Sequence, residues 1–306
     1  MFNKISEYFA IPVTPPFRLD FSVWALKRRP NNYIDLWDEN KYSRVFVIKD
    51  IVFKVEIIQQ KNTELKIRVI SRQKIDNVQT EIVQQLKNML GLQINLNDFY
   101  KMAFNDKYLK HLVNKFIGIK PPRFPSIFEA MINAISCQQL TLNFGILLLN
   151  RLAQNYGKKF EDEQAVTFAF PRPIDLKDIL IEDMKKLGFS YNKARAIKEL
   201  AISIVDQKMD LTIIEKMTDD ELIRYLSNIR GIGRWSSEYV LLRGFGRINV
   251  FPGDDVGAQK NIKELFNLNE KPTYEEIKKL TSHWNPYAGM VYFHLLLNKL
   301  EKERFL

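Results

Sequence analysis

The segment from Thr218 to Gly257 constrains the fold of this chain more than any other segment. Thr218 and Glu221 have the spacing of a capping box, which marks the start of a helix. The apolar residues that follow recur at helical spacing and share one face: Leu222, Tyr225, Leu226 and Ile229. The turn Gly231-Ile232-Gly233 comes next, and both of its glycines tolerate a positive φ. The segment therefore predicts a helix, a tight glycine turn and a second helix.

This turn is a candidate site for an anion. The second helix, expected to begin at Arg234 or Trp235, presents free backbone amides at its N-terminus, where the helix dipole is positive. Arg230 and Arg234 flank the turn, so the expected anion is a phosphate. On these residues alone an ordinary turn between helices is the alternative, because short glycine motifs occur in many helical proteins.

Two adjacent carboxylates, Asp254 and Asp255, come after the second helix. The residues from Val256 to Leu265 suit a helix, so Asp255 is expected at a helix N-terminus, where the dipole favours its ionised form. A capping aspartate is a common structural feature, and that interpretation stays open on the residues alone. Trp235 and Tyr239 are one helical turn apart and share a face, which indicates either a core position or the wall of a pocket.

The chain is basic and poor in metal-binding side chains. It has 46 Lys and Arg against 36 Asp and Glu, a net charge of +10, which favours a polyanionic partner such as DNA or RNA. Cys137 is the one cysteine, which excludes an internal disulfide, a cysteine zinc site and a four-cysteine iron–sulfur cluster. No apolar run is long enough for a membrane span and no signal peptide is evident, so a cytoplasmic location is expected.

The residue pattern divides the chain into two parts. Residues 1–92 alternate apolar and polar side chains at strand period, with a hairpin turn at Lys49-Asp50, and then show helical spacing from Ile75 to Leu90. From Asn95 the strands disappear. Helices are expected over residues 97–116, 127–137 (capped by Ser126), 140–156, 175–187, 192–207, 219–226, 256–265 and 274–300. The pattern predicts a small α+β domain followed by an all-helical part.

Two motifs resemble those of a known enzyme family. Residues 229–235 (IRGIGRW) and 251–255 (FPGDD) are similar to the helix-hairpin-helix (HhH-GPD) DNA glycosylases, and within them to the 3-methyladenine DNA glycosylase II type. The resemblance covers roughly residues 95–300, and residues 1–92 resemble the N-terminal domain of the same enzymes. It implies an α+β fold, with a small N-terminal antiparallel-sheet and helix domain before an all-α two-lobed domain. The implied limits are 1–92, then 93–118 with 245–306 for the lobe that carries the catalytic loop, and 119–244 for the lobe that carries the hairpin.

The resemblance also implies a role for each candidate residue. Asp255 is the catalytic carboxylate, beside a base pocket walled by Trp235 and Tyr239. Gln139 fills the gap left by an extruded base, and Leu140 at the next position is the alternative. Further implied contacts are to substrate from Gln138 and Tyr287, to DNA from Arg230, Gly231, Ile232, Gly233 and Arg234, and to a Na⁺ or K⁺ ion from the carbonyls of Ser227, Ile229 and Ile232. No organic cofactor is required.

The implied reaction is hydrolysis of the N-glycosidic bond of a damaged base, above all an alkylated purine, flipped out of double-stranded DNA. Family members that also cut the strand carry a lysine where this chain has Trp235, so no Schiff base can form there and a monofunctional enzyme is expected. The alternatives are a glycosylase for oxidised or deaminated bases, a non-catalytic DNA-binding protein, and an RNA-binding protein, although no recognised RNA-stacking motif is present. We expect a monomer that has no membrane partner.

Overall fold

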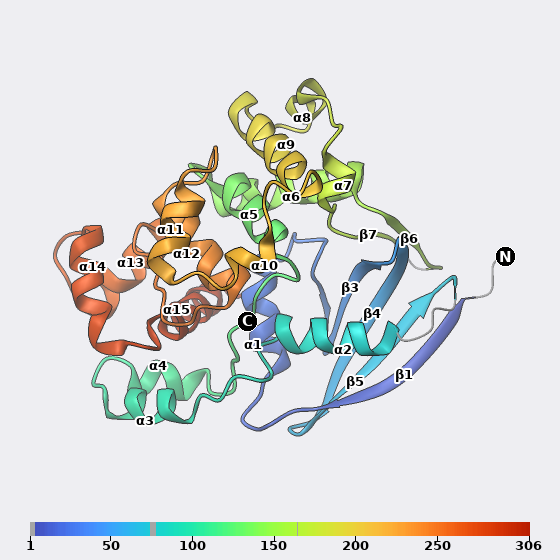
Figure 1. Cartoon of the computed structure of the whole chain (residues 1–306). Coiled ribbons are helices and arrows are strands. Elements are labelled where there is room, and N and C mark those ends of the chain that lie inside the picture. Colours follow the sequence, from blue (N-terminus) through green and yellow to red (C-terminus); the bar gives the residue numbers. More distant parts are fainter. Residues whose placement is uncertain (1–3, 74–77, 164) are drawn as a thin grey trace.

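The computed structural model describes residues 4–73, 78–163 and 165–306. Within these ranges the N-terminal part forms a five-stranded antiparallel sheet in the order β1-β5-β4-β3-β2 (Figure 1). The strands are β1 (Ile5–Pro12), β2 (Leu36–Asp38), β3 (Lys41–Ile48), β4 (Ile51–Lys61) and β5 (Glu64–Ser71). The predicted turn between β3 and β4 is confirmed, and both of its residues take the left-handed conformation, with φ of 49° at Lys49 and 63° at Asp50.

Helices cover one face of this sheet. α1 (Leu19–Lys27) and α2 (Val78–Met89) pack against it, and Figure 1 shows α2 lying across the strands. The shared core includes Ile11, Phe46, Val55, Ile57, Leu65 and Ile67 from the strand side and Val23, Leu26, Ile82 and Leu86 from the helices. The helix predicted from Ile75 is described from Val78, because residues 75–77 lie outside the described residues.

A second, smaller sheet packs on the opposite face of this sheet, and the sequence pattern did not predict it. β6 (Lys159–Glu161) and β7 (Val166–Phe168) form an antiparallel hairpin, so the expectation that strands end at Asn95 is wrong. The hairpin is fixed by the ion pair between Lys54 Nζ and Asp162 Oδ2, at 2.5 Å, and by a small apolar cluster. That cluster comprises Val45, Ile70, Phe160 and Ala169. Strands of three residues are too short to show a periodicity, and their packing partner is distant in sequence.

The rest of the described chain is helical. Its α-helices are α3 (Asn97–Asn105), α4 (Lys110–Lys115), α5 (Ile127–Cys137), α6 (Leu142–Tyr156), α7 (Pro173–Leu176), α8 (Ile181–Lys186), α9 (Tyr191–Val205), α10 (Leu211–Ile214), α11 (Asp219–Ser227), α12 (Arg234–Val240), α13 (Val256–Leu265), α14 (Tyr274–Thr281) and α15 (Ala288–Lys302). A π-helical turn, η1 (Leu241–Phe245), continues α12, and a 3₁₀ turn, η2 (Ser282–Trp284), follows α14. The predicted caps Ser126 and Thr218 are confirmed, since each side chain accepts a hydrogen bond from the backbone three residues on.

The helix expected over residues 97–116 is two helices, because Asp106 interrupts it. One carboxylate oxygen of Asp106 accepts the backbone N–H groups of Tyr108 and Leu109, at 2.7 and 3.1 Å. The other accepts the indole N–H of Trp284, at 2.9 Å. An aspartate that bonds its own following backbone offers the chain an alternative to helical hydrogen bonds. The contact with Trp284 fixes this break from a position 178 residues away.

Two other expected helices are also interrupted. The helix expected over residues 274–300 is broken after η2, where Asn285 is extended before Pro286. A residue that precedes proline is disfavoured in the helical region, which explains the break. The helix expected over residues 175–187 is divided into α7 and α8, with Leu180 in an extended conformation between them.

The helices pack around two further hydrophobic cores. One core draws mainly on α5, α6, α9, α11 and α12, and the other on α3, α4, α13 and α15, with Ala25 of α1. Trp284 and His294 are fully buried. Burial lowers the pKa of His294 to about 4, so its ring is neutral inside this core.

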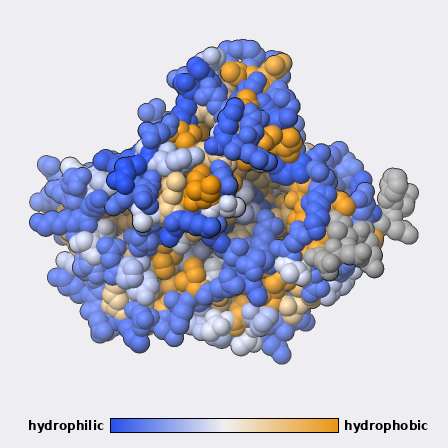
Figure 2. Space-filling model, in the orientation of Figure 1, coloured by the Kyte–Doolittle hydropathy of each residue, from blue (hydrophilic) through white to orange (hydrophobic). Residues whose placement is uncertain are grey.

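In the part of the chain that the structure describes, no helix is long and apolar enough to cross a bilayer. Figure 2 shows a largely hydrophilic face broken by small apolar patches.

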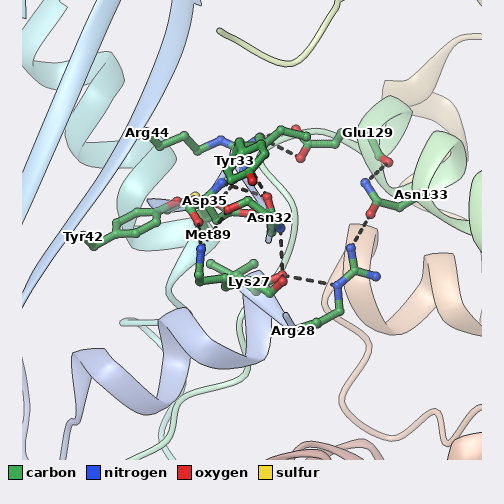
Figure 3. Close-up of polar contacts among 12 residues, drawn as sticks. Lys27, Arg28, Asn32, Tyr33, Asp35, Tyr42, Arg44, Met89, Glu129 and Asn133 are labelled. Atoms are coloured by element: carbon green, nitrogen blue, oxygen red, sulfur yellow. Dashed lines mark hydrogen bonds and ion pairs between the residues drawn. The ribbon is translucent and has the colours of Figure 1, made fainter. Parts of the chain in front are cut away.

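A buried polar network joins the N-terminal sheet to α5 (Figure 3). Arg44 on β3 forms ion pairs with Asp35, at 2.7 Å, and with Glu129 on α5, at 2.6 Å. Tyr42 donates its hydroxyl to Asp35 at 2.7 Å, and Lys27 donates to the carbonyl of Asp35 at 3.1 Å. Although burial alone would raise the pKa of Asp35, Arg44 and Tyr42 hold it below its ordinary value. Burial raises the pKa of Glu129.

Candidate active site

The glycine turn between α11 and α12 is built as a close contact with α9. Gly231 takes a left-handed φ of +79°, and a Cβ there would lie 2.8 Å from the Cβ of Ala196. Gly233 has a φ of −102°, and a Cβ there would meet nothing within 4 Å. A positive φ is therefore needed at Gly231 alone, whereas Gly233 opens the backbone to an approaching partner. α12 begins at Arg234, as predicted.

The two arginines that flank this turn are paired with carboxylates. Arg230 Nε donates to Glu199 at 2.7 Å, and Arg234 Nε donates to Asp254 at 2.7 Å. Both guanidinium groups are half exposed. The guanidinium of Arg234 also stacks on the ring of Tyr274, 3.7 Å from its centroid. Exposed ion pairs contribute little to stability, so neither carboxylate holds its arginine strongly.

Asp255 is half-buried beside this turn, at the N-terminus of α13, as predicted. Its Oδ1 accepts the backbone N–H of Ala258 at 2.8 Å, the usual hydrogen bond of a capping aspartate. Its Oδ2 accepts the indole N–H of Trp235 at 3.2 Å and the hydroxyl of Tyr292 at 3.4 Å. One oxygen of the carboxylate is thus committed to the helix, and the other lies among aromatic side chains.

A buried glutamate that sequence reasoning missed holds the loop before Asp255. Glu238 accepts the backbone N–H of Gly253 at 3.1 Å and the hydroxyl of Tyr274 at 2.6 Å. Gln259 donates to the carbonyl of Gly253 at 3.1 Å, so this glycine is held from both sides. Burial raises the pKa of Glu238. The sequence signal that could have found it is that Glu238 is the one acidic residue of α12.

Trp235 and Tyr239 form an aromatic wall next to Asp255. Their ring centroids are 5.5 Å apart and their planes differ by 29°, so the rings are stacked. Trp235 is partly exposed, whereas Tyr239 is only 5% exposed. Tyr292 of α15, which sequence reasoning did not assign to the site, completes the group through its contact with Asp255. Among the described residues Tyr287 has neither a hydrogen bond nor a ring contact with this group, and it packs instead on Phe99.

The turn between α5 and α6 lies against the hairpin. Gln138 donates to the carbonyl of Gly231 at 2.7 Å and to the hydroxyl of Ser236 at 2.6 Å, so its side chain braces the hairpin. Gln139 takes a left-handed φ of 52° and is exposed. Leu140 is 40% exposed and precedes α6, which begins two residues later than expected because Thr141 is its cap. Both candidates for the gap-filling side chain therefore lie at the tip of this turn.

The carbonyls proposed for a monovalent cation lie at the end of α11 and in the glycine turn. The carbonyl of Ile229 accepts the backbone N–H of Ile232 at 3.0 Å. Those of Ser227 and Ile232 accept no hydrogen bond from the described residues, so they fit an ion that binds backbone carbonyls. Over the same residues no group of three His, Cys, Asp or Glu side chains is placed to hold a metal.

Two protein-family models match the chain. The family model of the HhH-GPD superfamily base excision DNA repair protein matches residues 132–286, and that of the 8-oxoguanine DNA glycosylase N-terminal domain matches residues 29–130. A DNA-3-methyladenine glycosylase of Bacillus subtilis is 26% identical over 295 residues, covering 96% of this chain and 97% of the relative.

Two solved structures share the fold. The 3-methyladenine DNA-glycosylase from Archaeoglobus fulgidus superposes with a TM-score of 0.83 at 23% identity, covering 94% of this chain and 97% of that one. The Clostridium acetobutylicum 8-oxoguanine glycosylase/lyase, solved with double-stranded DNA that contains cytosine opposite 8-oxoguanine, gives a TM-score of 0.76 at 18% identity, covering 99% and 100% of the two chains.

The glycine hairpin, the nearby carboxylate and the family matches together define a base excision DNA repair protein. The chain belongs to the HhH-GPD superfamily. It is a DNA glycosylase of base excision repair, with homologues named 3-methyladenine glycosylases.

Proposed function

We propose that the protein is a monofunctional DNA glycosylase that removes alkylated purines from double-stranded DNA and leaves an abasic site. The observation that carries the proposal is the hydrogen bond from the Trp235 indole to Asp255, which puts the carboxylate at the edge of an aromatic wall. A base stacked on that wall places its deoxyribose beside the carboxylate. Trp235 stands where a lysine would be needed for a Schiff base, so water is the nucleophile.

Asp255 acts on the sugar. Departure of the base develops positive charge on the deoxyribose, and a fixed carboxylate stabilises that oxocarbenium-like state. The Oδ2 atom is the reactive oxygen, because Oδ1 is held by the backbone of α13. Oδ2 also orients or deprotonates the attacking water. Glu238 and Gln259 keep the loop in place through Gly253.

The helical hairpin of α11 and α12 binds the phosphate backbone around the flipped nucleotide. The amides at the start of α12, with Arg230 and Arg234, contact phosphates, and a Na⁺ or K⁺ ion on the carbonyls of Ser227, Ile229 and Ile232 supplies further positive charge. Gln139 or Leu140 enters the gap in the duplex. Extrusion of a single nucleotide needs only one copy of the chain, so we propose that the protein is a monomer. We also propose that it works in the cytoplasm.

The aromatic wall favours alkylated purines. Many alkylated purines are cationic and electron-poor, and flat aromatic faces attract them by stacking and by cation–π interaction. The partly exposed ring of Trp235 offers such a face beside Asp255, and the ring of Tyr239 is stacked behind it. The names of the relatives support the same substrate class.

Oxidised or deaminated bases are the second candidate substrates, because buried positive charge lies behind the wall. Phe124 contacts the Tyr239 ring, and the guanidinium groups of Arg28 and Arg243 lie 5.4 and 4.9 Å from the Phe124 centroid. Neither arginine forms an ion pair with a carboxylate of the described residues. Uncompensated cations in a low-dielectric site oppose a cationic base and favour a neutral one.

A panel of duplexes that each contain one methylated, oxidised or deaminated base tests the proposal. We expect base release from the duplexes with methylated purines, and strand breaks only after alkaline treatment. Release confined to oxidised or deaminated bases would favour the second candidate. Strand breaks without alkali, together with a sugar adduct trapped by borohydride, would contradict monofunctional hydrolysis.

Substitution of the two hairpin glycines separates their structural roles. Gly231→Ala is expected to lower the free energy of unfolding by about 1–3 kcal/mol, because it combines a left-handed φ with a contact of 2.8 Å. Gly233→Ala, the matched control, is expected to stay within about 0.5 kcal/mol of the parent protein in urea unfolding. Gly233→Ala should nevertheless weaken duplex binding, because its methyl group takes the space of the phosphate. Unchanged duplex binding would place the DNA elsewhere.

A further inference from the structure

Arg28 is a buried arginine from the N-terminal domain that reaches the aromatic wall. It follows α1 with a left-handed φ of 59°, and it is 6% exposed. Its Nη1 donates to the Tyr239 hydroxyl at 2.9 Å, and its Nη2 donates to Asn133 on α5 at 2.6 Å. Figure 3 shows Arg28 and Asn133 at one end of the buried network that includes Arg44 and Glu129. That network fixes α1, α5 and the sheet relative to one another, so Arg28 has a defined position.

The hydrogen bonds of Arg28 leave one of its donors without a partner. A guanidinium has five N–H groups and no acceptor, and the described residues accept four of them: the Tyr239 hydroxyl, Asn133, the carbonyl of Leu26 at 3.3 Å and the thiol of Cys137. The hydroxyl of Tyr239 accepts from Arg28, so its own hydrogen is directed elsewhere. Both groups therefore present hydrogen-bond donors, and a base that meets them satisfies them only with acceptor atoms.

Arg28 and Asp255 lie at opposite ends of one group of side chains. Asp255 accepts from Trp235, Trp235 stacks on Tyr239, and Tyr239 accepts from Arg28. The charges of Asp255 and Arg28 both act on Cys137 and Tyr239, whose pKa values are raised above all by burial. A base stacked on Trp235 with its sugar at Asp255 therefore extends its far edge toward Tyr239 and Arg28.

We propose that Arg28 is a specificity-determining residue of the base pocket, and that it selects damaged purines with a carbonyl at position 6 over those with an amino group there. A carbonyl oxygen accepts the hydrogens that Arg28 and Tyr239 present, whereas an amino group points its own hydrogens at them. A buried donor left unpaired loses its hydration without a replacement, and this cost discriminates between the two kinds of base. The inference rests on the proposed function, which puts the flipped base against Trp235.

Duplex DNA treated with dimethyl sulfate provides the test, because it contains 7-methylguanine and 3-methyladenine together. Both bases are cationic, so the repulsion from Arg28 is common to them, and their position-6 groups are a carbonyl and an amino group. Release of each base by the full chain is measured by mass spectrometry as a single-turnover rate. In Arg28→Met the ratio of 7-methylguanine to 3-methyladenine release is expected to fall about 10- to 100-fold, the value of a lost hydrogen bond to a charged donor.

Matched variants keep the test independent of folding. Arg29→Met removes a neighbouring arginine that donates to Asn143 and pairs with Glu303, and it should leave the ratio unchanged. Arg28→Lys retains the buried charge but not the planar donor fork, so the ratio should fall even if Arg28→Met does not fold. Tyr239→Phe removes the second donor and should move the ratio in the same direction.

The outcomes separate this inference from the proposed function. If the parent protein releases neither base, the proposed function itself fails. If the parent releases both bases and the ratio is unchanged or higher in the Arg28 variants, the selective role of Arg28 is overturned and the proposed function stands. An equal fall of the ratio in Arg29→Met would also overturn it, because the effect would then be a general loosening of the α1 turn.

Discussion

Replacement of Asp255 by Asn is expected to lower the rate of base release by about 100- to 1,000-fold, the cost of losing one fixed electrostatic group in a transition state. Asn is nearly isosteric and neutral, so it cannot stabilise positive charge on the sugar. It is also a good helix N-cap, so the hydrogen bond to the backbone of Ala258 persists and α13 keeps its start. Duplex binding should stay at the parent value, and the free energy of unfolding should fall by no more than about 1–2 kcal/mol, because the amide NH2 group of Asn cannot accept the indole N–H of Trp235 as Oδ2 does.

The measurement is single-turnover base release from a duplex with one methylated purine, alongside a binding titration. Asp254→Asn is the matched control, since Asp254 lies next in sequence and bonds Arg234 at the surface. Its effect on release should stay below about tenfold, because an exposed ion pair contributes little. A parent-like rate in Asp255→Asn would move the chemistry to another group and contradict the proposed mechanism.

Replacement of Arg44 by Met is expected to cost about 3–5 kcal/mol of unfolding free energy, because it leaves two buried carboxylates without their partner. Arg44 bonds Asp35 and Glu129, and all three side chains are at most 5% exposed. The loss should appear in urea unfolding at neutral pH. Since Glu129 lies on α5, the variant should also loosen the contact between the N-terminal sheet and the helical part.

Arg68→Met serves as the control for this prediction. Arg68 lies on β5 in the same sheet and forms an ion pair with Glu56 at 3.4 Å. The side chain of Arg68 is 43% exposed. Its removal should cost less than about 1 kcal/mol. If Arg44→Met also lost less than about 1 kcal/mol of unfolding free energy, Asp35 and Glu129 would have to be protonated or hydrated in the variant. The buried network would then not be what joins the N-terminal sheet to the helical part.

Short-range signals predicted the elements around the site correctly. The capping boxes and caps at Thr218, Ser126 and Asp255 involve residues three positions apart, so the chain itself contains both partners. The hairpin turn at Lys49-Asp50 is likewise a local property of its residues. Two predictions failed because a distant contact decides the local structure. Trp284 fixes the break at Asp106, and the sheet stabilises a short hairpin through Lys54.

The side chains of the site also divide into those that the sequence predicted and those that only the structure revealed. The sequence by itself determined the α+β fold, the family, and the candidate roles of the hairpin, of the aromatic pair at Trp235 and of Asp255, because these residues lie within one continuous segment. Only the tertiary structure decided that Tyr292 contacts Asp255, and that Arg28 meets Tyr239 across 211 positions of sequence. A hydrogen bond between such distant groups depends on how domains pack, and no periodicity or spacing in the chain encodes that packing.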